Sequence, residues 1–119
     1  MMVLPDTSIW IAHLRAGQPG FADLLMEGRV VMHPFVAGEL ACGNLSNRET
    51  ILADLAVLPS AQPASDGEVM RLVEDRRLWG RGLGWIDMHL LASALISYCG
   101  LWTLDKRLEA AASKLGVSY

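Results

Sequence analysis

Cysteine, long apolar runs and charge are all scarce in this chain. Only 2 of its 119 residues are cysteines, and Cys42 and Cys99 lack the spacing of a metal site. Both lie in apolar helical patterns, so we expect buried free thiols in a reducing compartment. No apolar run approaches the roughly 20 residues that span a bilayer, and the N-terminus lacks a basic segment followed by a long apolar one. We therefore expect a soluble, cytoplasmic protein without a membrane segment.

Charged residues make up 19% of the chain, against about 25% in an average soluble domain. The net charge of −3 and the pI near 5.5 argue against a protein that holds nucleic acid on a broad basic surface. They do not exclude a nuclease with local basic contacts. Hydrophobic residues reach 52%, above the usual level of about 45–50%, which suggests faces covered by a partner or by a second copy. The length indicates a single domain over residues 1–119 with one core.

Short apolar runs alternate with helical patterns along the whole chain. The runs at 2–4, 29–32, 101–104 and 116–119 predict strands, and 58–64 carries two prolines and predicts at most an edge strand. Helices are predicted at 9–14, 21–27, 35–42, 48–57, 86–98 and 106–115, and in an amphipathic stretch that begins with a capping box of Ser65 and Glu68. Such alternation is typical of an α/β fold with a parallel sheet that helices cover on both faces.

Four acidic residues are the candidate functional site: Asp6, Glu39, Asp87 and Asp105. Asp6 and Asp105 each follow a predicted strand, so they should project from the same edge of the sheet, where sites form in open parallel sheets. Clustered carboxylates raise each other's pKa and cannot all ionise without a compensating cation. Oxygen ligands without histidine or cysteine favour Mg²⁺ or Mn²⁺, and such sites most often serve phosphoryl transfer.

A purely structural role remains open for several of these acids. Asp6 could simply cap the first long helix, and Asp87 and Asp105 could be favourable first-turn charges. Capping and metal binding are compatible. Glu39 is more informative, because it interrupts an apolar helical stretch, and we interpret it as a site residue.

The ordered set of motifs Asp6-Thr7-Ser8, Gly38-Glu39-Leu40, Asp87 to Ala94 and Thr103-Leu104-Asp105 resembles the PIN-domain ribonucleases. The closest likeness is to the VapC-type toxins of bacterial and archaeal toxin–antitoxin pairs, and it extends over the whole chain. The resemblance implies a three-layer α/β/α fold with a short-stranded, mainly parallel sheet, in which the four acids hold one or two Mg²⁺ or Mn²⁺ ions that activate water to cut RNA. It also implies that Thr7, Ser8 and Thr103 donate hydrogen bonds to the carboxylates, that a cognate antitoxin blocks the site, and that two toxins pair as a homodimer.

Basic residues near the acidic motifs are candidate RNA contacts. Three of them surround Trp79 ahead of the glycine-rich stretch 80–84, and two follow Asp105; they are Arg76, Arg77, Arg81, Lys106 and Arg107. Surface charge and a solvated helix end are the alternative interpretations. The three histidines have no mutual spacing of a metal site, and we expect them to pack or to face solvent.

Two other functions stay open at this point. A receiver-like phosphoacceptor domain has a similar length, but it would need adjacent acids after the first strand, and Asp6 stands alone. A non-catalytic PIN-like module would bind RNA or protein without cutting, although it need not retain all four acids.

Overall fold

The computed structural model describes all 119 residues and contains two short strands and seven helices. The strands are β1 (Val3–Pro5) and β2 (Gly100–Trp102). The helices are α1 (Thr7–Ala16), α2 (Phe21–Met26), α3 (Pro34–Cys42), α4 (Arg48–Ala56), α5 (Asp66–Arg76), α6 (Trp85–Ser97) and α7 (Lys106–Lys114). None of these helices has the length and apolar character needed to cross a lipid bilayer.

The sheet is short-stranded and parallel. β1 pairs with β2 so that Leu4 lies opposite Leu101. Single parallel bridges extend the pairing on both sides: Val3 to Val30 and Met32 to Ser60 beyond β1, and Leu101 to Ser118 beyond β2. The predicted extended segments near residues 30, 60 and 118 are therefore present, each reduced to a bridge or two rather than a full strand.

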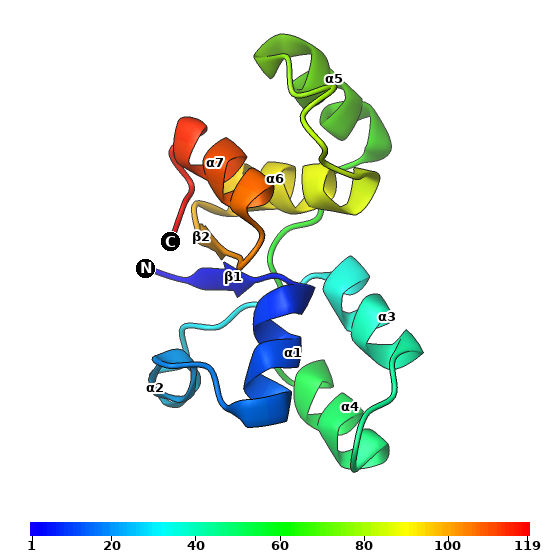
Figure 1. Ribbon diagram of the computed structural model, residues 1–119, viewed down its shortest axis with the longest axis vertical. Helices are drawn as coiled ribbons and strands as arrows, with labels where there is room; N and C mark the ends of the chain where they lie inside the picture. The colour runs from blue at the N-terminus through cyan, green and yellow to red at the C-terminus, as the bar shows by residue number, and fades with distance from the viewer.

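Helices cover both faces of the strands, and this confirms the predicted α/β/α layering. In Figure 1 α1 to α4 lie on one side of β1 and β2, and α5 to α7 lie on the other. Val3, Leu4 and Leu101 are fully buried between the two helical layers. Strands enclosed on both faces have no solvent side, which explains why they read as continuous apolar runs rather than as alternating patterns.

Three helices begin where the sequence places a capping side chain. The Asp6 carboxylate accepts from the Ile9 N–H at the start of α1, and Asp105 caps α7. Ser65 and Glu68 form the predicted capping box at the start of α5, in which each side chain accepts from the other's backbone N–H. Caps satisfy amide groups that have no partner inside the helix, so they fix the residue at which each helix starts.

The prediction of two buried thiols is wrong for Cys42. Cys99 is buried, but Cys42 is exposed in the last turn of α3. That helix buries Val36 and Leu40, which are four positions apart and share one face. Cys42 follows Leu40 by two positions, about 200° around the helix, and it therefore faces solvent.

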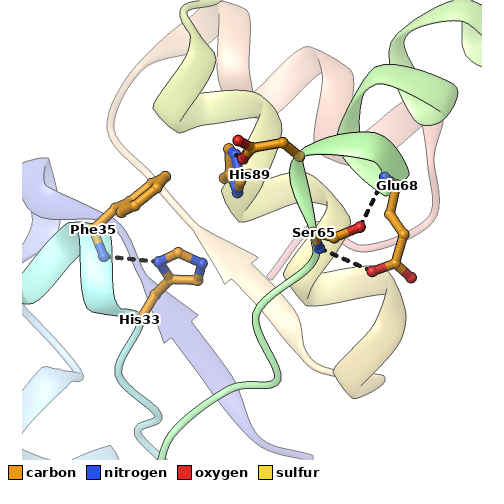
Figure 2. Close-up of polar contacts among 6 residues, drawn as sticks. His33, Phe35, Ser65, Glu68 and His89 are labelled. Atoms are coloured by element: carbon orange, nitrogen blue, oxygen red, sulfur yellow. Dashed lines mark hydrogen bonds and ion pairs between the residues drawn. The ribbon is translucent and has the colours of Figure 1, made fainter.

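An aromatic cluster joins α3, the residue before it and α6. His33 and His89 are 1% and 3% exposed, so both histidines pack inside the fold, and Phe35 lies across from His89 at a ring separation of 4.7 Å (Figure 2). His33 Nδ1 accepts from the Phe35 N–H and caps α3. Nε2 of His89 lies 3.2 Å from a carboxylate oxygen of Asp66, without the geometry of a hydrogen bond. Burial, together with nearby His89, lowers the pKa of His33 to about 4.

Candidate active site

Asp6 and Thr103 lie side by side where β1 and β2 end. Asp6 directly follows β1, and its N–H donates to the carbonyl of Trp102, the last residue of β2. The Thr103 hydroxyl donates to Oδ2 of Asp6 at 2.5 Å. Asp6 is only 7% exposed, so this bond compensates part of the desolvation of its carboxylate.

Ser8 links the other carboxylate oxygen of Asp6 to the segment that follows β2. Its hydroxyl donates to Asp6 Oδ1 at 2.5 Å and accepts from the Leu104 N–H at 3.0 Å. The Ile9 N–H also donates to Oδ1, at 3.2 Å. Donors on both oxygens fix the orientation of the carboxylate. The hydroxyl positions predicted around Asp6 thus contact it directly.

Glu39 reaches the same edge from α3. The Thr7 hydroxyl donates to Glu39 Oε1 at 2.6 Å, which ties α1 to α3. The other carboxylate oxygen, Oε2, accepts no hydrogen bond from the protein, and the residue is exposed. Glu39 interrupts the apolar pattern of α3 because its side chain faces this edge rather than the core.

Asp87 is the third residue of α6 and is half-buried. Its Oδ2 accepts from the Gly84 N–H at 3.0 Å, and Oδ1 has no partner in the protein. Burial raises the pKa of Asp87 in spite of the Gly84 bond, and the negative charges of Asp105, Asp6 and Glu39 raise it further. The four acids predicted from the sequence are therefore close enough to act on one another electrostatically.

Asp105 is exposed and is held at the N-terminus of α7. Its Oδ1 accepts from the N–H groups of Arg107 and Leu108, at 2.8 and 3.1 Å. Its own N–H donates to the Thr103 hydroxyl at 3.0 Å. Thr103 thus links Asp105 to Asp6, while Oδ2 of Asp105 remains without a hydrogen-bond partner.

Three of the four acids line one open groove of about 480 Å³. The wall consists of Asp6, Thr7, Glu39, Gly84, Trp85, Ile86, Asp87 and Leu90. Asp105 lies beyond this wall. No three acidic, histidine or cysteine side chains converge tightly enough to hold an ion between them as they stand, so the arrangement is looser than the dense cluster expected from the sequence.

The donor set nevertheless fits a hard divalent cation. Apart from the indole of Trp85, the polar side chains that line the groove carry carboxylate or hydroxyl oxygens, the ligands that Mg²⁺ and Mn²⁺ prefer. None of the four acids forms an ion pair with a lysine, arginine or histidine. Burial raises the pKa of Asp87, the charges of the other three acids raise it further, and no cation of the protein relieves this repulsion.

The basic residues that were candidate RNA contacts lie outside this wall. Three lie at and beyond the end of α5, where the Arg81 side chain bonds the Arg77 carbonyl, and two open α7; all are exposed: Arg76, Arg77, Arg81, Lys106 and Arg107. Trp85 and Ile86 line the groove although sequence reasoning did not single them out for it. Their position one turn or less before Asp87 in a helix was the available signal.

Three comparisons with known proteins gave matches. Residues 3–114 match the model of the PIN domain. The chain is 48% identical over 118 residues to a protein named "Ribonuclease VapC32" from two strains of Mycobacterium tuberculosis, CDC 1551 / Oshkosh and ATCC 25618 / H37Rv. The match covers 98% of this chain and 95% of each relative. Among solved structures, the crystal structure of PAE2754 from Pyrobaculum aerophilum has a similar fold, with a TM-score of 0.63 at 18% identity over 92% of this chain and 78% of that one.

Proposed function

The chain belongs to the PIN domain family, and from this premise we propose that it is a metal-dependent endoribonuclease of the VapC type, the toxin of a toxin–antitoxin pair. Its near full-length similarity to a relative named as a ribonuclease supports RNA as the substrate. The proposal treats residues 1–119 as a single PIN-like domain and the groove as its active site.

One observation carries this proposal. Asp6, Glu39 and Asp87 come from three separate elements to line one groove, and no cation of the protein balances them. A half-buried carboxylate such as Asp87, whose pKa is raised by burial and then by neighbouring acids without a base to pair with it, is typical of a functional site. RNA is anionic and would be repelled from these acids unless a cation were bound there.

We assign the cation to Mg²⁺ or Mn²⁺, with Asp6, Glu39, Asp87 and Asp105 as the residues that would hold it. When bound, such an ion lowers the pKa of a coordinated water and stabilises charge on phosphate oxygens. Three of these residues keep a carboxylate oxygen that no protein group bonds; they are Glu39, Asp87 and Asp105. Those oxygens are available to a ligand without breaking a contact of the fold.

The hydroxyl residues act by orienting the acids. Ser8 and Thr103 hold both oxygens of Asp6, and Thr7 holds one oxygen of Glu39. Fixed carboxylates lose less conformational freedom when they bind, and outer hydrogen bonds of this kind are usually needed for full affinity and activity. Water-activating chemistry would thus be supported by residues that do not touch the substrate.

We further propose a cognate antitoxin that covers the groove and a homodimer of the toxin. Exposed apolar side chains near the groove support a protein partner there: Phe35 and Trp85 are 36% and 42% exposed, and both border a second hollow of about 510 Å³ beside Glu39. Co-purification with the product of the adjacent gene, and the mass in solution by light scattering, test these two assignments.

Of the two alternative functions that the sequence left open, one now lacks support. Membership of the PIN domain family leaves the receiver-like function without support, and Asp6 has no adjacent acid. A non-catalytic module that binds RNA or protein remains the competing function, and it predicts binding without cleavage.

Cleavage of total cellular RNA by the purified, antitoxin-free chain tests the proposal. We expect discrete fragments with Mg²⁺ or Mn²⁺, none with EDTA, and none from Asp6→Asn. The matched control is Asp23→Asn, an exposed acid in α2 outside the groove, which should cleave as the wild type does. Folded, metal-loaded wild-type protein that leaves every RNA intact would favour the non-catalytic module.

A further inference from the structure

The side chain of Arg107 lies directly on the backbone of Gly82. A Cβ atom placed on Gly82 would stand 2.6 Å from Nη1 and 2.8 Å from Cδ of Arg107. Gly82 also has a φ of +76°, which side-chain-bearing residues rarely adopt. A side chain at position 82 would therefore be strained by the backbone, and the Arg107 side chain would have to move to make room for it.

Arg107 has no partner for its charge. The residue is exposed, and its guanidinium forms neither a hydrogen bond nor an ion pair in the structure. Arginine beside carboxylates ordinarily pairs with one of them, since the planar guanidinium fits a carboxylate with two parallel bonds. Here only the backbone N–H of Arg107 bonds Asp105, and the side chain extends instead over the loop at Gly82.

This contact joins the two segments that carry the last two acids. Gly82 lies in the loop that ends at Gly84, whose N–H holds Asp87. Arg107 lies in the first turn of α7, whose N-cap is Asp105. The unpaired cation therefore lies against the loop that leads to Gly84 in the groove wall, and it belongs to the helix that Asp105 caps.

We propose that Arg107 binds a phosphate of the RNA beside the groove, and that Gly82, which has no side chain, leaves the space in which the Arg107 side chain is positioned. The inference rests on the proposed function and adds to it a phosphate-binding residue and a positioning residue. Guanidinium groups bind phosphate with two parallel hydrogen bonds, and a side chain already held against the loop loses less rotamer freedom on binding. The positive charge of Arg107 beside the groove also offsets the repulsion between the acids and the RNA backbone.

The first test measures binding rather than cleavage. A short fluorescein-labelled single-stranded RNA of mixed sequence is titrated with the full chain in Mg²⁺, by anisotropy, at several NaCl concentrations. Asp6→Asn is present in every protein compared, so that the RNA is not cut. We expect Arg107→Ala to weaken binding about tenfold and to reduce the slope of log K against log salt by about 0.7, the value for one phosphate contact on a single strand. Lys114→Ala removes an equal charge from the last turn of the same helix and should leave the slope unchanged.

The second test measures the contribution of Gly82 to the position of Arg107. Gly80 and Gly82 have φ values of +71° and +76°, but a Cβ on Gly80 meets nothing within 4 Å. Both Gly80→Ala and Gly82→Ala should therefore lower the melting temperature through backbone strain, and only Gly82→Ala should also weaken RNA binding. In the Arg107→Ala background, Gly82→Ala should cause no further loss of binding. Arg107→Lys should keep the salt slope and lose part of the affinity, because it keeps the charge without the planar fork.

Equal salt slopes for the Asp6→Asn parent, Arg107→Ala and Lys114→Ala would overturn the proposal, as would a parent protein that does not bind this RNA in Mg²⁺. Equal RNA binding by Gly80→Ala and Gly82→Ala would overturn the proposal that Gly82 positions Arg107. These outcomes are separate from the fate of the proposed function. If Arg107→Ala cleaves RNA as the wild type does, only this inference is refuted. If RNA binding is as expected but the wild-type protein never cleaves, only the nuclease function is refuted.

Discussion

Thr103 and Asp6 are 97 positions apart in the sequence, yet the Thr103 hydroxyl donates a 2.5 Å hydrogen bond to the Asp6 carboxylate. We expect Thr103→Val, which keeps the shape and removes the donor, to destabilise the fold by about 1.5–3 kcal/mol, because a buried carboxylate loses a charged hydrogen bond. Urea denaturation checks the stability. Metal-dependent cleavage should fall about 10–100-fold, as is usual when a group that orients a metal ligand is lost.

Thr103→Ser is the control for this change, since it keeps the hydroxyl and removes only a methyl group. It should retain most of the stability and activity. If Thr103→Ser were as impaired as Thr103→Val, packing of the methyl group would matter more than the hydrogen bond.

Asp87→Asn should remove cleavage and at the same time stabilise the metal-free protein. The raised pKa of Asp87 shows that its surroundings disfavour the charged carboxylate even with the Gly84 bond in place. Asparagine is neutral, is close in shape and can still accept from Gly84. We expect the melting temperature in EDTA to rise by a few degrees, measured by circular dichroism. A lower melting temperature would mean that the helix N-terminus gains more from the charge than the cluster loses.

Divalent metal should stabilise the wild-type chain. A ligand that binds only the folded state adds about 2.7 kcal/mol of stability at one hundred times its dissociation constant. The melting temperature should therefore rise with Mn²⁺ concentration, and the rise should be smaller in Glu39→Gln. The control is Glu49→Gln, an exposed acid of α4, which should respond as the wild type does. Equal shifts in both variants would remove Glu39 from the metal site.

His33 should make the fold sensitive to mild acid. Its pKa is about 4 in the folded protein, against 6.5 for an ordinary histidine. Between these pH values the unfolded chain binds the extra proton and the folded chain does not, so stability should fall as pH drops from about 6.5 towards 4. The full difference corresponds to about 3 kcal/mol. Denaturation curves across this range measure the effect.

His33→Asn is the informative variant, because asparagine can cap α3 but has no proton to gain in this range. Its stability should depend less steeply on pH between 4 and 6.5 than that of the wild type. An unchanged dependence would assign the acid sensitivity to other groups.

The two thiols should differ in reactivity. Cys42 is exposed and Cys99 is buried, and burial raises the pKa of Cys99, which lowers the fraction of reactive thiolate. Iodoacetamide under native conditions should modify Cys42 and spare Cys99, as read by peptide mass spectrometry, while urea should expose both. Protection of Cys42 that disappears on dilution would place it in a contact between copies.

The layered fold was predictable because its signals are local. Continuous apolar runs such as that around Leu101 mark strands that are buried on both faces, and Asp6, Ser65 and Asp105 fix the starts of three helices through contacts within a few residues. The error at Cys42 is of the opposite kind. The side on which Cys42 lies depends on which face of α3 packs against the core, and the apolar residues around Cys42 do not specify that face.

The site was predictable in its residues more than in its geometry. The acids and hydroxyls stand at element boundaries that can be located in the sequence, and a resemblance to a known family supplied the grouping. Which acid lines the groove and which is held at a helix cap depends on backbone placement, as Asp87 and Asp105 illustrate. The contact between Gly82 and Arg107 depends on one side-chain direction and left no signal in the spacing.

The pairing of β1 with β2 also determines when a newly made chain acquires the sheet edge that carries Asp6 and Thr103. Every residue of α1 to α6 is synthesised between Asp6 and its partner Thr103. Contacts of such large sequence separation form slowly, since a long loop must close before they are made. A ribosome-bound chain that has not yet released β2 holds Asp6 without its hydroxyl donor and has no α7 to present Asp105 or Arg107. A chain whose synthesis stops before β2 therefore lacks Thr103, Asp105 and Arg107, and with them the complete carboxylate edge.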